Sequence, residues 1–164
     1  MAYRQTTVLD TPIGGIGVFA SDGVVTGVSF GAAATHDESG DLDPILARAV
    51  AELADYFAGE RLEFSVATEF VRGSEFERAV WAQIAGIPYG ETRSYGSLAH
   101  AVGEPGGAQA VGLACNRNPL PLIIPCHRVI GSDGKLVGFG GGLHRKRWLL
   151  ELEARIWIEH SFAP

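Results

Sequence analysis

Residues 94–119 read SYGSLAHAVGEPGGAQAVGLACNRNP and contain two short helical patterns separated by a turn. The apolar residues of the first pattern stand one helical turn apart: Tyr95, Leu98, Ala99 and Val102. The second pattern repeats that spacing: Ala108, Val111, Gly112 and Cys115. Ser94 can cap the first helix, residues 103–106 form the turn, and Pro119 ends the second helix. Two core helices joined by a turn are the commoner interpretation of such a pattern, but a DNA-reading helix–turn–helix fits too. The small residues of the second helix favour that reading, because they let its backbone approach another surface closely.

The segment that follows this helix pair ends in a candidate nucleophile. Residues 120–125 are apolar and predict a buried strand or extended run that leads to Cys126, which His127 and Arg128 follow. A thiol with a pKa of about 8.5 becomes a better nucleophile beside a histidine base or positive charge. Adjacent side chains do not meet on a strand or a helix, so Cys126–His127 cooperation requires irregular backbone or a water between them. From spacing alone, a nucleophile and a buried small hydrophobe are equal alternatives for Cys126; Cys115, on its helix's apolar face, is expected to be structural.

The last part of the chain combines a glycine-rich run with a basic helix start. Residues 138–142 read GFGGG, and their spacing is not that of a phosphate-binding loop. They predict either a flexible turn or a backbone wall that lets a flat ligand come close. The final helix is expected to pack through its apolar stripe: Trp148, Leu149, Leu152 and Ile156. Glu153 borders that stripe, so it is either a solvated carboxylate or a buried one with His127 as its partner.

The first third of the chain predicts a small α+β unit. Residues 1–10 are strand-like, and Asp22-Gly23 is a hairpin turn between strands at residues 16–20 and 24–30. Asp43-Pro44 begins a helix that Gly59 ends, and residues 62–66 alternate like another strand. Ser74 and Glu77 form a capping-box pattern at the start of the next helix. These signals predict an N-terminal structural domain over residues 1–73 and a second domain over residues 74–164.

Charge is distributed unevenly between these two parts. The formal net charge is −6, which by itself argues against a nucleic-acid partner. Residues 1–74 carry 4 Lys and Arg against 11 Asp and Glu, whereas residues 75–164 carry 9 against 8. Screening limits the reach of a charge to about 10 Å at moderate salt. The second half, with Arg145, Lys146 and Arg147 adjacent, could therefore still meet phosphate.

Composition and cysteine usage indicate an ordinary folded protein of a reducing compartment. Hydrophobic residues make up 46% and charged residues 20% of the 164 residues. Two cysteines are too few for a disulfide framework, and no Cys/His cluster suggests a metal site. No apolar run approaches the roughly 18 residues that a membrane span needs. With no signal peptide at the N-terminus, we expect a cytoplasmic protein that binds no metal and no membrane.

The same residues resemble the O6-alkylguanine-DNA alkyltransferases over about residues 76–153. The motif that carries most of the resemblance is Pro125-Cys126-His127-Arg128-Val129. Further matches stand at the family's spacings: Tyr89-Gly90-Glu91, Ser94-Tyr95, Asn118-Pro119, Gly140 to Leu143, Lys146, Trp148 to Leu150 and Glu153. The resemblance implies a ribonuclease H-like N-terminal sheet-plus-helix domain. It also implies a mostly helical, winged helix–turn–helix-like C-terminal domain.

The resemblance implies a stoichiometric DNA-repair reaction that needs no cofactor. Cys126 would displace the alkyl group from O6-alkylguanine, and in addition from O4-alkylthymine, in double-stranded DNA. His127 would take the thiol proton through a water, and Glu153 would hold and polarise His127. Asn118 would tie the helix–turn–helix to the Cys126 segment, and Tyr95 would donate a hydrogen bond that helps guanine leave. The thioether is not hydrolysed, so each molecule, expected to be a monomer, would act once.

The resemblance also implies where the flipped base and the duplex are held. The backbone of Val129 and of the Gly140 region would bind the base edge, and Phe139 would form a pocket wall. Ala108 and Gly112 on the second helix would enter the minor groove. Arg117 and Ser132 would contact phosphates, which supply most of the sequence-independent binding.

Position 109 departs from the family pattern. The family usually has an arginine there, which fills the gap left by the flipped base, and this chain has Gln109. Glutamine is shorter and uncharged, so weaker DNA binding is expected. Two other functions fit parts of the sequence: a damage sensor without chemistry, which the presence of Cys126 disfavours, and a cysteine hydrolase, which would turn over repeatedly.

Overall fold

The computed structural model describes residues 4–33 and 42–162. The chain divides into two compact units, Met1–Val71 and Arg72–Pro164, and each is described by itself.

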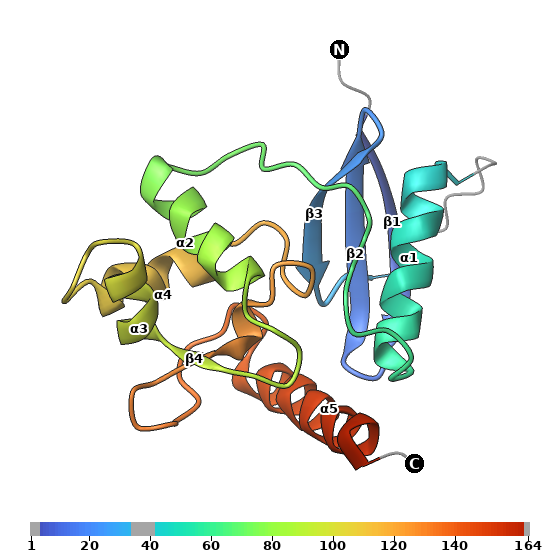
Figure 1. Ribbon diagram of the computed structural model, residues 1–164. Coiled ribbons are helices and arrows are strands. Elements are labelled where there is room, and N and C mark those ends of the chain that lie inside the picture. The colour runs from blue at the N-terminus through green and yellow to red at the C-terminus, as the bar shows by residue number, and fades with distance from the viewer. Residues whose placement is uncertain (1–3, 34–41, 163–164) are drawn as a thin grey trace. The chain divides into compact units, whose positions relative to one another are not determined.

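The first unit is built on an antiparallel sheet of strand order β1-β2-β3 within its described residues (Figure 1). The strands are β1 (Arg4–Thr11), β2 (Gly14–Ser21) and β3 (Val24–Phe30). Asp22 and Gly23 connect β2 to β3 with φ angles of 51° and 80°. Positive φ at both central residues is the two-residue hairpin geometry that an Asp-Gly pair favours, so the predicted hairpin is confirmed. Of the strand expected over residues 1–10, the first three lie outside the described residues.

Helix α1 (Pro44–Phe57) lies along this sheet (Figure 1). The Asp43 side chain accepts a hydrogen bond from the backbone N–H of Ile45, and Pro44 occupies the first turn, as the sequence predicted. The helix buries four apolar side chains: Leu46, Ala49, Leu53 and Tyr56. Gly59, just after the helix end, has a φ of 77°, a conformation that glycine adopts without steric cost.

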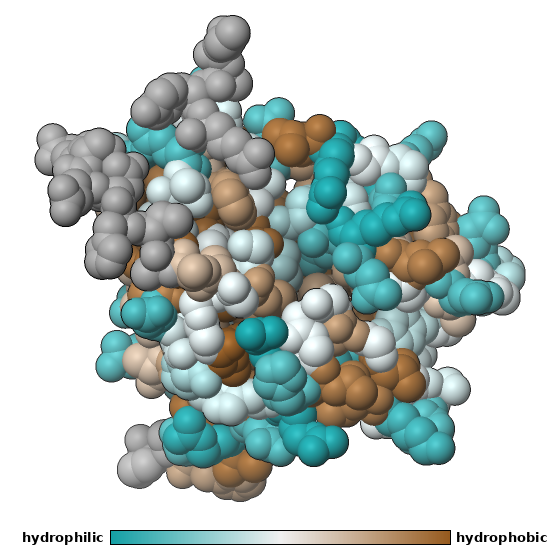
Figure 2. All heavy atoms as spheres, turned by 180° about the vertical axis from the view of Figure 1, so that it is seen from behind, coloured by the Kyte–Doolittle hydropathy of each residue, from teal (hydrophilic) through white to brown (hydrophobic). Residues whose placement is uncertain are grey.

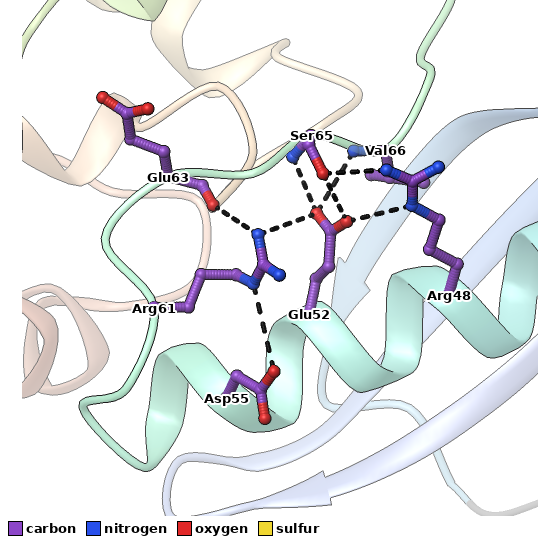
Figure 3. A network of polar contacts seen from close by, with 7 residues as sticks. All are labelled: Arg48, Glu52, Asp55, Arg61, Glu63, Ser65 and Val66. Carbon is purple, nitrogen blue, oxygen red and sulfur yellow. Dashed lines mark hydrogen bonds and ion pairs between the residues drawn. The ribbon is translucent and has the colours of Figure 1, made fainter.

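Residues 62–66 do not form the strand that their alternation predicted; the segment is irregular. The backbone N–H groups of Ser65 and Val66 donate to Glu52 Oε1, at 2.8 and 3.2 Å. Arg48 and the Ser65 hydroxyl donate to Glu52 Oε2, and Arg61 Nη1 lies 3.9 Å from Glu52 Oε1 (Figure 3). A buried carboxylate on α1 therefore satisfies N–H groups that a strand would have paired in a ladder.

The second unit begins two residues before the expected boundary at residue 74. Arg72 donates to the carbonyl of Arg117, and a Cβ on Gly73 would stand 2.5 Å from the Trp81 ring. Both residues thus belong with the helices that follow. Helix α2 (Glu75–Ala85) starts with the predicted capping box, in which Ser74 and Glu77 bond each other's backbone N–H.

The predicted helix–turn–helix is present as α3 (Tyr95–Ala101) and α4 (Ala108–Asn116). Ser94 caps α3 by accepting from Ser97 N. Trp81 of α2 donates from its ring nitrogen to Ala114 O of α4 at 2.8 Å. Two short parallel strands, β4 (Arg93–Ser94) and β5 (Val129–Ile130), join the start of α3 to the segment after Cys126. The long helix α5 (Leu143–Phe162) completes the unit (Figure 1).

The apolar segment 120–125 is buried but does not form the expected strand. Pro121 and Ile124 bridge each other across a tight turn, and Leu122 has a φ of 73°. The chain therefore reverses before it reaches Cys126.

On the face seen in Figure 2, hydrophobic residues form several small patches that are separated by hydrophilic residues. Among the described helices, none is both long and apolar enough to cross a bilayer.

Candidate active site

Cys126 lies in a 3₁₀ turn over Cys126–Arg128 and is 4% exposed. The Asn118 side chain hydrogen-bonds both ends of the segment that leads to this turn. Its Nδ2 donates to Ile124 O and its Oδ1 accepts from Leu120 N, both at 2.9 Å. Asn118 follows α4 directly, so one buried amide links the helix–turn–helix to the segment that carries Cys126.

The 3₁₀ turn supplies the irregular backbone that a Cys126–His127 pair requires. Cys126 N–H donates to Ile124 O at 2.8 Å, and Arg128 N–H donates to Pro125 O at 2.9 Å. The neighbouring side chains consequently follow neither the opposite-face alternation of a strand nor the regular spacing of an α-helix.

His127 and Glu153 form a buried pair between this turn and α5. His127 Nε2 lies 2.7 Å from Glu153 Oε2, and the two side chains are 0% and 2% exposed. Within the described part of the chain, His127 Nδ1 is buried and has no hydrogen-bond partner. The imidazole is thus held at one nitrogen, and the other nitrogen can take a proton.

Arg128 also binds Glu153, a contact that the sequence did not reveal. Its Nε donates to Oε1 at 2.7 Å and its Nη2 to Oε2 at 3.0 Å. Its Nη1 donates to Ile87 O at 2.7 Å. The sequence suggested that Arg128 places a positive charge beside the Cys126 thiol, whereas its guanidinium pairs with the Glu153 carboxylate.

The pKa values follow from this burial and pairing. Burial by itself raises the pKa of Glu153, but His127 and Arg128 outweigh it and lower that pKa to about 2. Burial raises the pKa of the Cys126 thiol to about 11, although the Asn118 side chain and the charge of Lys146 act in the opposite direction. The carboxylate is therefore ionised and the resting thiol protonated at neutral pH.

Lys146 is fully buried, which corrects the expectation that it belongs to a surface cluster with Arg145 and Arg147. Its ammonium donates to Val129 O at 2.5 Å and to Val137 O at 3.0 Å. Tyr95 Oη lies 3.5 Å from the same Nζ and donates to Val137 O at 3.1 Å. Arg145 is half-buried and Arg147 exposed, because a helix directs successive side chains to different faces.

The residues expected to hold a base lie near this lysine. Val129 is buried; its carbonyl faces Lys146, and its N–H donates to Cys126 O. Phe139 is half-buried and Gly140 exposed. A Cβ on Gly140 would meet nothing closer than Asn116 O, at 3.8 Å. Tyr95 has a pKa raised to about 12, mainly by burial, so its hydroxyl keeps its proton.

The residues expected to meet DNA lie on or after α4. Ala108 and Gly112 are half-buried and Gln109 is exposed. Arg117 is 69% exposed, with Nη1 3.7 Å from Glu77 Oε2, and Ser132 is exposed. Cys115 faces inward and has a pKa raised to about 12, mainly by burial.

Comparison with known proteins identifies the family. Residues 75–155 match the profile of the 6-O-methylguanine DNA methyltransferase DNA binding domain, and residues 5–70 match that of the same family's ribonuclease-like domain. The crystal structure of Mycobacterium tuberculosis OGT in complex with DNA aligns with a TM-score of 0.82 and 46% identity, over 92% of this chain and 93% of that chain. The chain belongs to the 6-O-methylguanine DNA methyltransferase family.

Among the curated relatives of this chain, two that are named methylated-DNA–protein-cysteine methyltransferase come from a bacterium of the genus Mycolicibacterium and from an archaeon of the genus Methanosarcina. The protein from Mycolicibacterium paratuberculosis is 58% identical over 109 residues, which are 66% of this chain and 66% of that protein. The protein from Methanosarcina acetivorans is 52% identical over 102 residues, 62% of this chain and 65% of that protein. Each match therefore spans just under two thirds of the relative's length.

Sequence reasoning missed the role of Glu52, Arg128 and Lys146 in this chain. All three are charged side chains that the fold buries against oppositely charged groups or carbonyls. For Lys146, its place on the apolar side of the final helix, three residues before Leu149, was a usable signal. For Arg128 the sequence offered none, since its partner is 25 residues away.

Proposed function

We propose that this chain repairs alkylated DNA by moving the alkyl group from O6 of guanine to the sulfur of Cys126. The observation that carries the proposal is the buried Cys126–His127–Glu153 cluster in a chain of this family. A cysteine, a histidine and a carboxylate that interact in this order form an activated nucleophile. The carboxylate orients the histidine, and the histidine takes the thiol proton.

The transfer is a single displacement. The thiol proton passes through a water to His127 Nδ1, and Cys126 Sγ forms a bond to the alkyl carbon. The bond between that carbon and O6 breaks, and its electron pair stays on the guanine. The guanine then gains one proton, which balances the one lost by the thiol. A hydrogen bond from the Tyr95 hydroxyl stabilises the departing base.

The product explains why each molecule acts once. A thioether has no carbonyl for water to attack, so no second step regenerates Cys126. We assign O4-alkylthymine as a second substrate, because its alkyl group also sits on an exocyclic oxygen of a base.

The target base must leave the duplex, because O6 is inaccessible within the stack. The small side chains of Ala108 and Gly112 let α4 approach a minor groove closely. Gln109, beside them, is the residue that takes the place of the flipped base. Arg117 and Ser132 supply phosphate contacts, while the backbone of Val129 and Gly140, with Phe139, holds the base. The first unit is assigned a structural role, and the chain is proposed to act as a cytoplasmic monomer.

Product counting tests this function against a cysteine hydrolase. Excess duplex containing O6-methylguanine is incubated with the protein, and restored guanine is counted per protein molecule. We expect a plateau at one guanine per protein. A Cys126→Ser variant should bind the duplex with unchanged affinity and restore none. Product that continues to accumulate after one equivalent would instead support a hydrolase.

A further inference from the structure

Glu153 is contacted at both of its oxygens by residues of the Cys126 turn. Oε1 accepts from Arg128 Nε at 2.7 Å; Oε2 accepts from Arg128 Nη2 at 3.0 Å and lies 2.7 Å from His127 Nε2. The two arginine contacts form a parallel fork, the geometry in which a guanidinium binds a carboxylate most strongly. Arg128 is 6% exposed, so water does little to weaken this pair.

A third contact fixes the guanidinium from the other side. Arg128 Nη1 donates to Ile87 O at 2.7 Å, and the Tyr89 ring lies 5.4 Å from the guanidinium carbon. The segment after α2 therefore holds Arg128, which holds Glu153 on α5, which in turn holds His127. The arrangement leaves the carboxylate no freedom to turn away from the imidazole.

The charge of that carboxylate decides which nitrogen of His127 carries the proton. An ionised carboxylate only accepts hydrogen bonds, so Nε2 must carry a hydrogen at a distance of 2.7 Å. In the neutral ring Nδ1 then has the free lone pair, and this buried atom has no partner within the described residues. The imidazole can accept the thiol proton only at a nitrogen with a free lone pair, which here is Nδ1.

We propose that Arg128 is a positioning residue for alkyl transfer, which keeps Glu153 ionised and so keeps the lone pair of His127 on Nδ1. The inference rests on the proposed function and adds a residue to it. Without the Arg128 guanidinium, burial favours the loss of the Glu153 charge. Glu153 can take up a proton and donate a hydrogen bond to Nε2, which leaves the ring hydrogen on Nδ1, or it can draw a second proton onto the imidazole. Both changes remove the lone pair that accepts the thiol proton.

Nitrogen NMR of the histidine ring tests the proposal independently of activity. Full-length protein is labelled with ¹⁵N-histidine, and the signals of His127 are assigned by their loss in His127→Gln. We expect the wild type at neutral pH to show a protonated Nε2 and an unprotonated Nδ1. Arg128→Met should lose that pattern. Arg155→Met is the matched control, because Arg155 lies on α5 in an exposed ion pair with Glu159, and it should keep the pattern.

Single-turnover kinetics provide the second readout. Arg128→Met should bind methylated duplex with wild-type affinity but transfer methyl about 10- to 100-fold more slowly, a loss in the range that general-base catalysis supplies. If Arg128 acts through Glu153, the double variant Arg128→Met/Glu153→Gln should be no slower than Glu153→Gln alone. Should Arg128→Met fail to fold, Arg128→Lys carries the same test and must be slower than wild type.

Three results would overturn the proposal: an unchanged His127 nitrogen pattern in Arg128→Met, a transfer rate within about two-fold of wild type in the folded variant, or fully additive losses in the double variant. Failure of the wild type to transfer any methyl group would refute the proposed function instead. The nitrogen pattern would then still decide whether Arg128 sets the state of His127.

Discussion

At the scale of single residues, the unusual feature is a candidate nucleophile, Cys126, whose thiol is protonated in the resting protein. Cys126 is 4% exposed and has a thiol pKa raised to about 11 by burial. A permanently ionised thiol would react with any electrophile, and under the proposed function each reaction consumes the protein. A buried thiol next to a buried base can become a thiolate when the substrate is in place.

Alkylation by a small reagent should therefore be slow and strongly dependent on pH. Because the raised pKa lies well above neutral, the thiolate fraction of Cys126 should rise about tenfold per pH unit between pH 7 and 9. Iodoacetamide labelling followed by peptide mass analysis measures this rate. A rate that levels off near pH 8 would mean that the resting thiol is already activated.

Gln109 stands where the family resemblance leads us to expect an arginine. Gln109→Arg should strengthen binding to methylated duplex by about 5- to 10-fold, because an arginine adds stacking and one positive charge near phosphate. Fluorescence anisotropy at fixed salt measures the affinity, and Gln83→Arg on α2 controls for added charge alone. Equal affinity of Gln109→Arg and the wild type would remove position 109 from the DNA interface.

Residue types and spacing alone left two interpretations open for Cys126 and for Glu153, and only the family resemblance joined them to His127 as a candidate site. The burial of Arg128 and Lys146 was not predicted at all. Arg128 and Lys146 also stood in the sequence, but their burial depends on partners brought from other elements: Glu153 and Ile87 for one, Val129 and Val137 for the other. A charged side chain is expected outside unless such partners exist.

At the scale of elements, local signals predicted helices and hairpins well and the buried irregular segments poorly. The Asp22-Gly23 hairpin, the Asp43 cap and the Ser74 capping box each depend on residues within a few positions. The conformation of residues 62–66 instead depends on a distant side chain, and that of residues 120–125 depends on a tight turn. Glu52, 13 residues before Ser65, replaces the ladder partner that the alternation of residues 62–66 implied.

Glu52 should stabilise the first unit as a clamp between α1 and this segment. Glu52→Gln removes a charged acceptor from Ser65, Val66 and Arg48, which should cost about 2 kcal/mol of unfolding free energy. Hydrogen exchange of the β1–β3 amides measures this, since all three tryptophans lie after residue 74. Glu63→Gln, at an exposed carboxylate of the same network region (Figure 3), is the matched control.

The same Glu52 contacts should make the stability of the first unit depend on pH in the acid range. Burial raises the pKa of Glu52, but the hydrogen bonds from Ser65, Val66 and Arg48 outweigh it and leave that pKa below its usual 4.5. The carboxylate therefore contributes stability above pH 4.5 that is lost as the pH falls through its lowered folded value. Wild type should lose more protection than Glu52→Gln over this acid range, and equal losses would contradict the clamp.

At the scale of the whole molecule, composition, charge and motifs all change near residue 70, which is why we predicted two domains, and the chain divides into the compact units Met1–Val71 and Arg72–Pro164. The acidic residues concentrate in the first unit, and the second carries the helix–turn–helix and the Cys126 cluster. Net charge of the complete chain would have misled, since a charge acts over about a Debye length. The match of two family profiles to residues 5–70 and 75–155 follows the same division.

DNA binding should depend on salt through a small number of cations on the second unit. Arg117→Ala should weaken binding equally for all sequences and reduce the slope of log affinity against log salt by about 1, as expected when one phosphate contact is lost. Arg155→Ala, which removes an equally exposed arginine far along α5, should leave the slope unchanged. Identical slopes for wild type and Arg117→Ala would remove Arg117 from the phosphate contacts.

The claim that Cys126 is consumed by its own reaction can be tested by weighing the protein. Intact protein is incubated with a duplex that contains one O6-methylguanine, and its mass is measured before and after peptide mapping. The account predicts the gain of one methyl group per molecule, located on Cys126 and absent from Cys115. An unchanged protein mass alongside restored guanine, or a methyl group on any other residue, would contradict it.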